Sequence, residues 1–311
     1  KLKLEFNDIK KPDFLGIKVL EDYSLEELRK YIDWSPFFNT WEMKGTYPKI
    51  LSSAKYGEVA TTLFQEANEM LDKIIAENWL QAKAVFGLFP ANSVNDDDIE
   101  ITHEGEKVML HHLRQQGEKR AKQNNNCLAD FVAPKESGLQ DYVGAFTVTA
   151  GIGIEKHIEA FEKEHDDYSS IMLKALADRL AEAFAERLHE RVRKEFWAYA
   201  PEENFDNEAL IREKYQGMRP APGYSACPDH TEKITLFNLL ETEKNIGAKL
   251  TSSCAIYPAA SVSGWYMAHP ETQYFGVGRI SEDQLDDYAA RKNYSKEDME
   301  KWLGVNINYK K

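Results

Sequence analysis

A short segment braced by two prolines, Arg-Pro-Ala-Pro-Gly-Tyr at residues 219–224, holds the residue types that a small zwitterion needs. Proline fixes φ and has no N–H, so the backbone donors left along this stiff loop are those of Ala221, Gly223 and Tyr224. Glycine also lets a ligand or another backbone approach closely. Arg219 can hold a carboxylate through two parallel hydrogen bonds. The segment favours binding of an amino-acid-like ligand, although an exposed Pro-Gly loop with a solvated arginine has the same composition.

A carboxylate among aromatic rings is a second candidate for ligand binding. Asp33 is followed closely by Trp34, Phe37, Phe38 and Trp41. A carboxylate can accept two hydrogen bonds from a ribose diol, and the nearby rings could cover a purine. The alternative is that Asp33 ends a helix beside aromatic residues of the core.

Two further pairs of residues could complete such a site. Tyr274 and Phe275 fall in a stretch, residues 273–279, that reads as a strand, so their side chains should point to opposite faces. One would pack in the core while the other, or the backbone, meets a ligand. Glu213 and Glu182 could face a cationic group, because a carboxylate favours a fixed positive charge where water is excluded. A strand core for the first pair and a solvated helix face for Glu182 are the plainer alternatives.

Other candidate motifs lack a necessary member. Residues 151–153 read Gly-Ile-Gly after a strand, but Lys156 stands where a dinucleotide loop needs its third glycine. His111 and His112 have no partner at metal-ligand spacing, so we expect structural histidines. Residues 261–265 hold serines without a placed base, which favours a turn over a nucleophile.

The composition excludes several classes of function. The 311 residues include 39 Lys and Arg against 52 Asp and Glu, a net charge of −13, which argues against nucleic acid and an anionic membrane surface as partners. No apolar run approaches the roughly 20 residues that cross a bilayer. The three cysteines form no CxxC pair, so we expect no zinc site or disulfide framework and a reducing, cytoplasmic location. Without an initiator Met or a signal-peptide pattern, the chain is expected to be a fragment of a longer polypeptide.

Hydrophobic periodicity predicts the elements that would hold these residues. Helices are expected from Ser24 to Ile32, ended by Ser35-Pro36, over 57–79, over 168–197, over 231–243, and twice near the C-terminus, the last capped by Ser295. His165 and Asp166 read as polar capping at the entry to the long helix. Strands are expected at 84–89, closed by Pro90, at 128–132, 142–149, 250–257 and 273–279, with a hairpin of strands 99–102 and 107–110.

These strands occur in clusters and do not alternate one by one with helices. This order favours an α+β fold, with one twisted, mostly antiparallel sheet flanked by helices, over a doubly wound fold. Residues 1–20 are weakly patterned and are expected to form an extended lead-in. Residues 21–311 are expected to form one domain, because no linker or internal repeat is evident.

Segments spread over nearly the whole chain form a recognisable series. The most specific is Arg-Pro-Ala-Pro-Gly-Tyr at 219–224, followed by Cys-Pro-Asp-His-Thr-Glu-Lys at 227–233. The others, in chain order, are residues 31–38, 87–92, 111–116, 128–134, 174–184, 261–266 and 274–275. In this series the chain resembles the C-terminal S-adenosylmethionine-binding activation domain of cobalamin-dependent methionine synthase.

The resemblance implies a single α+β domain that binds S-adenosylmethionine without a Rossmann fold, in agreement with the missing third glycine. In such enzymes the cobalamin, held by another domain of the same polypeptide, is occasionally oxidised to inactive cob(II)alamin. One-electron reduction, commonly by flavodoxin in bacteria, is then coupled to methyl transfer from S-adenosylmethionine and restores methylcobalamin. The chain would thus be part of a methyltransferase of methionine biosynthesis and would not be catalytically complete alone.

The resemblance also implies roles for individual residues. Asp33 would hold the ribose, and Arg219 would hold the methionyl carboxylate. Ala221 and Tyr274 would offer backbone contacts, with Phe275 adjoining them. The physical properties of these residues suit such roles, but the roles themselves come from the resemblance.

The remaining implied roles concern charge and the corrin. Glu213, and more weakly Glu182, would lie on the cationic side of the ligand, and Tyr224 would face the corrin. No protein residue is expected to be catalytic, because the cofactor and cosubstrate carry the chemistry. The alternative is a ligand-sensing or docking module in which S-adenosylmethionine only biases a conformational equilibrium. A stand-alone methyltransferase would often need a general base near the methyl group, and none can be placed.

Overall fold

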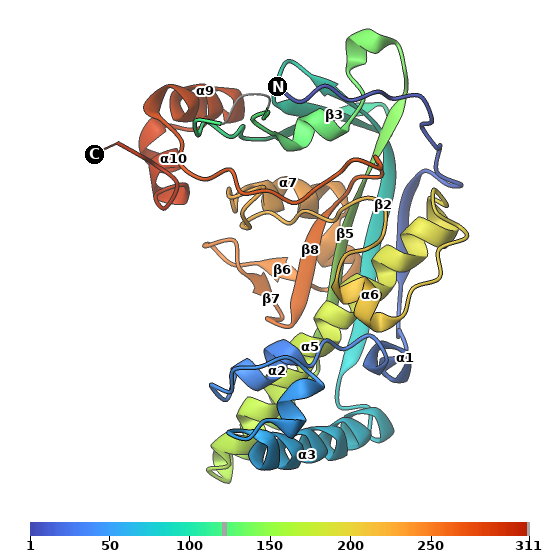
Figure 1. Ribbon diagram of the computed structural model, residues 1–311, viewed down its shortest axis with the longest axis vertical. Helices are drawn as coiled ribbons and strands as arrows, with labels where there is room; N and C mark the ends of the chain where they lie inside the picture. Colours follow the sequence, from blue (N-terminus) through green and yellow to red (C-terminus); the bar gives the residue numbers. More distant parts are fainter. Residues whose placement is uncertain (120–122, 310–311) are drawn as a thin grey trace.

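Strand β2 (Gln81–Val94) organises the computed structural model, which describes residues 1–119 and 123–309 (Figure 1). Phe86 and Leu88 enter the core on one face of the sheet, while Val85 and Phe89 enter the core on the other face. Because side chains alternate along a strand, burial on both faces makes β2 read as a continuous apolar run. Residues 120–122 and 310–311, which belong to the predicted domain 21–311, lie outside the described residues.

The central sheet has six strands, and every pair of neighbours is antiparallel. The order is β4 (Glu106–His111), β3 (Asp98–His103), β2, β5 (Asp141–Ile152) and β8 (Ser261–Tyr266), and β1 (Gly16–Leu20) also pairs with β2. The predicted α+β class with a mostly antiparallel sheet is confirmed. Of the lead-in segment 1–20, residues 1–15 belong to no helix or strand and the last five residues form β1.

Pro90 does not close its strand, contrary to the prediction. Strand β2 pairs with β1 over Ala84–Leu88 and with β3 over Ala91–Val94. Pro90 lies in the gap between these two pairings, where β2 is paired with β5 alone. A residue without an N–H is tolerated where one side of the ladder is interrupted, so β2 passes through the proline.

The predicted hairpin is confirmed at β3 and β4. His103 pairs with Glu106, which leaves Glu104 and Gly105 as a two-residue loop, both with positive φ. Such turns match the right-handed twist of the two strands.

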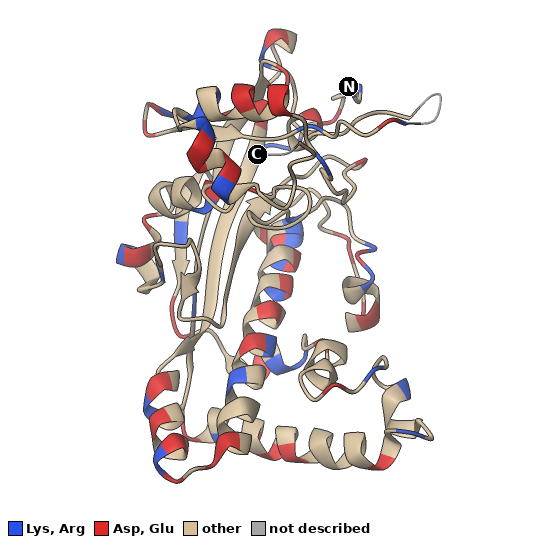
Figure 2. Cartoon of the chain, turned by 90° about the vertical axis from the view of Figure 1, so that its left-hand side faces the viewer, with Lys and Arg blue, Asp and Glu red and all other residues tan. Residues whose placement is uncertain are grey.

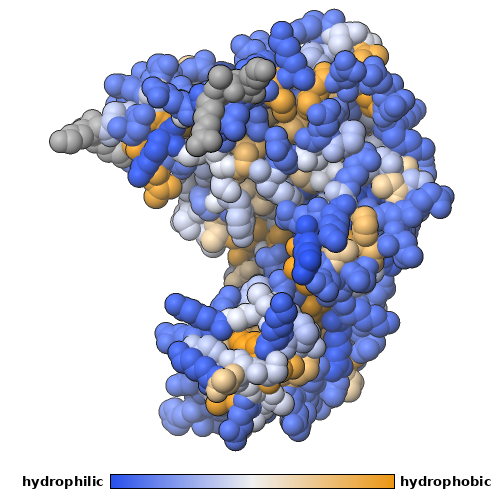
Figure 3. All heavy atoms as spheres, in the orientation of Figure 1, coloured by the Kyte–Doolittle hydropathy of each residue, from blue (hydrophilic) through white to orange (hydrophobic). Residues whose placement is uncertain are grey.

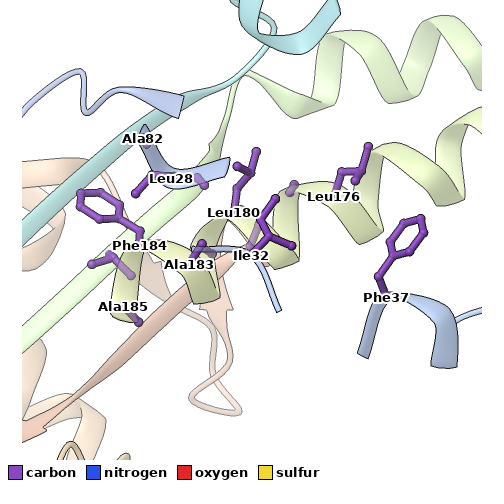
Figure 4. Packing of buried hydrophobic residues seen from close by; sticks show 14 of the residues in the cluster. Leu28, Ile32, Phe37, Ala82, Leu176, Leu180, Ala183, Phe184 and Ala185 are labelled. Carbon is purple, nitrogen blue, oxygen red and sulfur yellow. The ribbon is translucent and has the colours of Figure 1, made fainter. Parts of the chain in front are cut away.

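Helices cover one face of the sheet and share its larger core. The long α5 (Asp167–Arg191), capped by Asp166 as predicted, continues into a π-helical turn, Val192–Phe196. The other helices on this side are α1 (Leu25–Arg29), α2 (Ser35–Asn39), α3 (Gly57–Ala76) and α4 (Ile154–Lys163). Figure 4 shows Leu28, Ile32 and Phe37 gathered around Leu176 and Leu180 of α5. Helix α1 ends at Arg29, before the predicted break at Ser35-Pro36, and these two residues begin α2, because proline is well tolerated in a first helical turn.

The opposite face carries shorter elements. The helix expected at 231–243 is α7 (Glu232–Leu239) and α8 (Thr242–Ile246), broken at Glu241, which has φ +47°. The stretch 250–257 is also divided, into β6 (Lys249–Leu250) and β7 (Ile256–Tyr257). Helices α9 (Glu282–Lys292) and α10 (Lys296–Trp302) close the chain, and Ser295 caps α10 as predicted.

Two predicted strands are wrong. Residues 128–132 hold a 3-10 helix, Leu128–Phe131, because Asp130 accepts from the backbone N–H of Cys127 and forms an ion pair with Arg114. Residues 273–279 have no regular structure. The N–H of Val277 donates to the carbonyl of Ser225, so this stretch is fixed by a loop and not by a strand.

Charge is concentrated on the helices, and Figure 2 shows few charged residues on the central strands. All three cysteines are buried and free. Over residues 1–119 and 123–309, no helix is both long and apolar enough to cross a membrane.

Candidate functional site

One cavity of about 230 Å³ gathers five of the eight residues that the sequence analysis selected. They are Glu182, Arg219, Ala221, Tyr224 and Tyr274. The rest of the lining is Phe146 of β5, Val262 of β8, Pro220, Ser225 and Ala226. The cavity therefore lies where the proline-braced segment meets α5 and the edge of the sheet.

The segment is held in place by backbone pairing with the end of β8. Met218 and Met267 exchange two backbone hydrogen bonds, of 2.9 and 3.0 Å, and Trp265 N donates to Pro220 O at 2.9 Å. Gly264 permits this approach, because a Cβ there would lie 2.8 Å from Pro220 O. The two prolines thus stiffen a segment that is also anchored at its beginning.

Only one of the three predicted backbone donors is left for a ligand. The N–H of Gly223 donates to Cys227 O at 2.7 Å, and that of Tyr224 donates to Ala221 O at 3.1 Å. The N–H of Ala221 has no partner among the described residues, and Ala221 lines the cavity. The turn itself uses the amides of Gly223 and Tyr224, so of the three donors left by the prolines only that of Ala221 stays available.

Gly223 is required by the fold of the loop, not by approach of a ligand. Its φ is +94°, and a Cβ there would lie 2.4 Å from Cε1 of His230. Glycine is the residue that adopts this conformation without strain.

The guanidinium of Arg219 lies in a buried network. Its Nη1 and Nη2 donate to the two carboxylate oxygens of Glu186, at 3.2 and 2.6 Å. Nη1 also lies 3.1 Å from Nδ1 of His189 and donates to the hydroxyl of Tyr215 at 2.8 Å. Burial alone would lower the pKa of Arg219, but the Glu186 carboxylate holds it well above its ordinary value. The open alternative of a solvated arginine is excluded, since 19% of this side chain is exposed.

Tyr274 meets Arg219 through its side chain. Its hydroxyl accepts a hydrogen bond of 2.9 Å from the backbone N–H of Arg219. Phe275 does not line the cavity, and its ring packs 6.4 Å from that of Phe131. The pair is therefore divided between the cavity and the core, although this division does not arise from a strand.

Asp33 stands apart from this cavity, immediately before α2. Its Oδ1 accepts a hydrogen bond of 2.9 Å from Ser35 N, and Oδ1 is the only one of its oxygens with a partner within the described chain. Trp34, Phe37 and Phe38 are buried in the core, so they are not available to cover a purine, and Trp41 alone of the four rings stays partly exposed. Figure 3 shows the surface hollowed between the part that contains α2 and the part that contains β6 and β7.

The two glutamates differ in their surroundings. Glu182 is exposed and lines the cavity, and it raises the pKa of the Tyr224 hydroxyl in addition to the effect of burial. Tyr224 itself is 68% exposed. Glu213 follows α6 (Asn207–Ile211) and does not line the cavity. Burial raises its pKa while the charge of Arg219 lowers it.

Sequence reasoning missed Glu186, His189 and Tyr215, which surround the arginine. Glu186 and His189 follow Glu182 by four and seven residues on α5, so all three share one helix face. Polar residues recurring at this spacing in α5 were the signal that could have found Glu186 and His189, whereas Tyr215 lies outside this helix.

The motifs that sequence analysis set aside have structural roles. Gly153 forms the turn into α4, and Ser261 Oγ donates to Pro258 O. His111 pairs with Asp98, and His112 is buried. In the part of the chain that is described, no group of three or more His, Cys, Asp or Glu is arranged to hold a metal.

Comparisons with known proteins show what the chain is similar to. The model of the family described as vitamin B12 dependent methionine synthase, activation domain, matches residues 24–293. A solved structure described as the MetH reactivation domain bound to AdoHcy (S-adenosylhomocysteine) is similar, with 54% sequence identity and a TM-score of 0.94. The match covers 99% of this chain and 96% of that chain.

Proposed function

Because the chain belongs to the family of vitamin B12-dependent methionine synthase activation domains, we propose that it binds S-adenosylmethionine and presents the methyl group to reduced cobalamin on a neighbouring domain. The bound S-adenosylhomocysteine of the similar structure supports this ligand, since the two molecules differ by that methyl group. The methyl transfer itself is the part of the proposal that needs its own test.

The observation that carries the proposal is the cavity around Arg219. Arg219, whose side chain is 19% exposed, and Ala221, whose N–H has no partner among the described residues, both line one small space, and a guanidinium with a free amide suits the carboxylate of an amino acid. The cavity, at about 230 Å³, is smaller than the roughly 300–1,000 Å³ of clefts that enclose a whole drug-sized ligand. It would therefore take the methionyl end, with the nucleoside extending along the hollow toward Asp33.

The charges around the cavity suit a sulfonium ligand. Glu182 lies at the cavity and Glu213 lies close enough to Arg219 for their charges to interact. A carboxylate near the sulfonium would stabilise its positive charge. Tyr224, which lines the cavity and is 68% exposed, is proposed to face the corrin.

The division of chemistry explains why the site needs no nucleophile or general base. When bound, reduced cobalamin supplies the nucleophile, and the sulfonium is already an activated methyl donor. This chain would hold the methyl group in line with its acceptor and leave one side of the site open for the corrin. Its partners would be the cobalamin-binding domain of the same polypeptide and a one-electron reductant such as flavodoxin, in the cytoplasm.

The proposal is tested with a polypeptide that joins this chain to a cobalamin-binding domain. We expect that, with reduced cobalamin and S-adenosylmethionine, the methyl group is transferred to cobalamin and S-adenosylhomocysteine is released. The absorption spectrum of the corrin follows the reaction. Binding of S-adenosylmethionine without transfer would favour the alternative, a ligand-sensing or docking module.

A further inference from the structure

We propose that Glu186 is a positioning residue. It binds the edge of the Arg219 guanidinium formed by Nη1 and Nη2, so that a ligand carboxylate binds the remaining side edge, formed by Nε and Nη2. This inference rests on the proposed function, because it specifies how that site would recognise the amino-acid end of its ligand. It adds a residue of α5 that never touches the ligand.

The ion pair has the geometry of a fork facing a fork. Oε1 and Oε2 of Glu186 lie 3.2 Å from Nη1 and 2.6 Å from Nη2 of Arg219, so the carboxylate occupies the edge formed by the two terminal nitrogens. Glu186 is itself buried, with 6% of its surface exposed. Two parallel hydrogen bonds fix the orientation of the guanidinium plane as well as its position.

The outer side of Nη1 is also occupied. His189 Nδ1 and the Tyr215 hydroxyl lie 3.1 and 2.8 Å from it. The Arg219 guanidinium stays protonated, so its Nη1 can only donate. The Nδ1 of His189 must therefore accept, which places the imidazole hydrogen on Nε2. Burial, together with the nearby charges of Arg193 and Arg219, keeps the pKa of His189 well below its ordinary value, so the ring stays neutral.

These contacts leave one edge of the guanidinium for a ligand. A guanidinium has five N–H groups in a fixed plane. The Nε–H of Arg219 makes no hydrogen bond with the described residues, and Nη2 has a single partner, Glu186. Nε–H and the second Nη2–H point the same way, so they match the two oxygens of one carboxylate. Arg219 also lines the cavity, so this edge belongs to a side chain that a ligand can reach.

Recognition of the ligand carboxylate would then depend more on the orientation of the Arg219 N–H groups than on the net charge of the site. Glu186 already neutralises Arg219, so the attraction of the pair for a distant anion is weak. A carboxylate gains from the site only where it meets both free N–H groups. Loss of the anchor should therefore weaken ligands that carry the carboxylate and spare those that lack it.

The test compares two ligands that differ in this one group, S-adenosylmethionine and decarboxylated S-adenosylmethionine. Calorimetry measures the affinity of the whole chain for each ligand, in the wild type and in Glu186→Gln. We expect Glu186→Gln to lower the affinity for S-adenosylmethionine by about tenfold or more, the scale of a lost charge-assisted hydrogen bond. The affinity for the decarboxylated ligand should change by less than about threefold. Arg219→Ala is less suitable, because it leaves Glu186 buried without its partner.

Asp130→Asn is the matched control. Asp130 forms a similar forked ion pair with Arg114, through distances of 2.6 and 2.9 Å, and neither residue lines the cavity. This variant should change the affinities for both ligands equally or not at all. Equal losses for both ligands in Glu186→Gln would show a merely structural role. Unchanged or increased affinity for S-adenosylmethionine would show that Glu186 acts only as a counter-charge, and either result overturns the inference.

A second measurement uses the unaltered protein, so the inference can still be tested if Glu186→Gln does not fold. The NMR signal of the Arg219 Nε–H, assigned by its loss in Arg219→Lys, should shift with S-adenosylmethionine and not with the decarboxylated ligand. A signal that is unmoved by saturating S-adenosylmethionine would contradict side-edge binding. If the wild type binds neither ligand, the proposed function fails, whereas binding of both with equal affinity defeats this inference alone.

Discussion

The hydroxyl of Tyr274 accepts a hydrogen bond from the backbone N–H of Arg219, with 2.9 Å between Tyr274 Oη and Arg219 N. The contact ties the irregular stretch 273–279 to the start of the proline-braced segment. Arg219 is thus fixed twice, at its backbone by Tyr274 and at its guanidinium by Glu186. The position of this arginine, which we propose binds the ligand, is set by elements that are far apart in the sequence.

Tyr274→Phe should lower the free energy of unfolding by about 0.5–1.5 kcal/mol, the usual net contribution of one hydrogen bond. Chemical denaturation measures the change. Tyr294→Phe is the control, because Tyr294 is similarly exposed (37% against 42%) and its hydroxyl has no partner within the described residues. Equal stability of the two variants would show that the Tyr274 hydroxyl does not anchor the segment.

Gly223→Ala should destabilise the chain by about 1–3 kcal/mol, through positive φ and overpacking. The new Cβ would lie 2.4 Å from the ring of His230. Thermal unfolding of Gly223→Ala, of His230→Ala and of the double variant separates the two causes. The double variant should recover the part that comes from the clash and keep the part that comes from φ. A single Gly223→Ala variant as stable as the wild type would refute this account of the loop.

His112 should make the fold sensitive to acid. Burial, opposed in part by Asp98 and reinforced by His111, Arg291 and Lys292, lowers its pKa from 6.5 to about 3. Between these values the unfolded chain binds a proton that the folded chain does not, so stability is lost as the pH falls from 6.5 toward 3. Neither ring nitrogen of His112 has a hydrogen-bond partner among the described residues.

His112→Leu should therefore cost little at pH 8, because no hydrogen bond is removed. As the pH falls below 6.5, the variant should become more stable relative to the wild type. Urea unfolding at pH 8, 6 and 4.5 measures the difference. Parallel stability curves for the two proteins would mean that His112 does not titrate differently in the folded and unfolded chains.

Asp33→Asn should weaken ribose recognition and leave the fold unchanged. An asparagine oxygen can still accept the hydrogen bond from Ser35 N, which keeps the start of α2 intact. Affinity should fall by about 1.5–3 kcal/mol, as for a lost hydrogen bond to a charged group. The loss should be similar for S-adenosylmethionine and for 5′-methylthioadenosine, which keeps the ribose but has no amino-acid end. Unchanged affinity for both ligands, or an unfolded variant, would remove Asp33 from the site.

The sequence predicted those features that depend on interactions between residues close together in the chain. The caps at Ser24, Asp166 and Ser295 follow from side chains that accept hydrogen bonds from the helix that they precede. The apolar runs predicted β2 to β5, whereas β1 was expected to be part of the lead-in, and β8 lies where a turn was expected. The proline-braced segment lines the cavity, and its stiffness is a property of its own residues.

Contacts between distant segments could not be predicted in this way. Residues 128–132 have the pattern of a strand, but the ion pair of Asp130 with Arg114 favours a 3-10 helix. No residue near Asp130 in the sequence indicates that Arg114 is its partner. The same holds for Arg219 and Glu186, which are separated by 33 residues. The sequence therefore left a solvated Arg219 open as an alternative, whereas tertiary packing buries and orients this side chain.

A crystal structure of this chain with S-adenosylmethionine bound would test the central claim most directly. We predict that both oxygens of the methionyl carboxylate lie within hydrogen-bonding distance of Nε and Nη2 of Arg219, while Glu186 keeps its present contacts. A ligand bound elsewhere on the surface, or a carboxylate that displaces Glu186 from the guanidinium, would contradict the account.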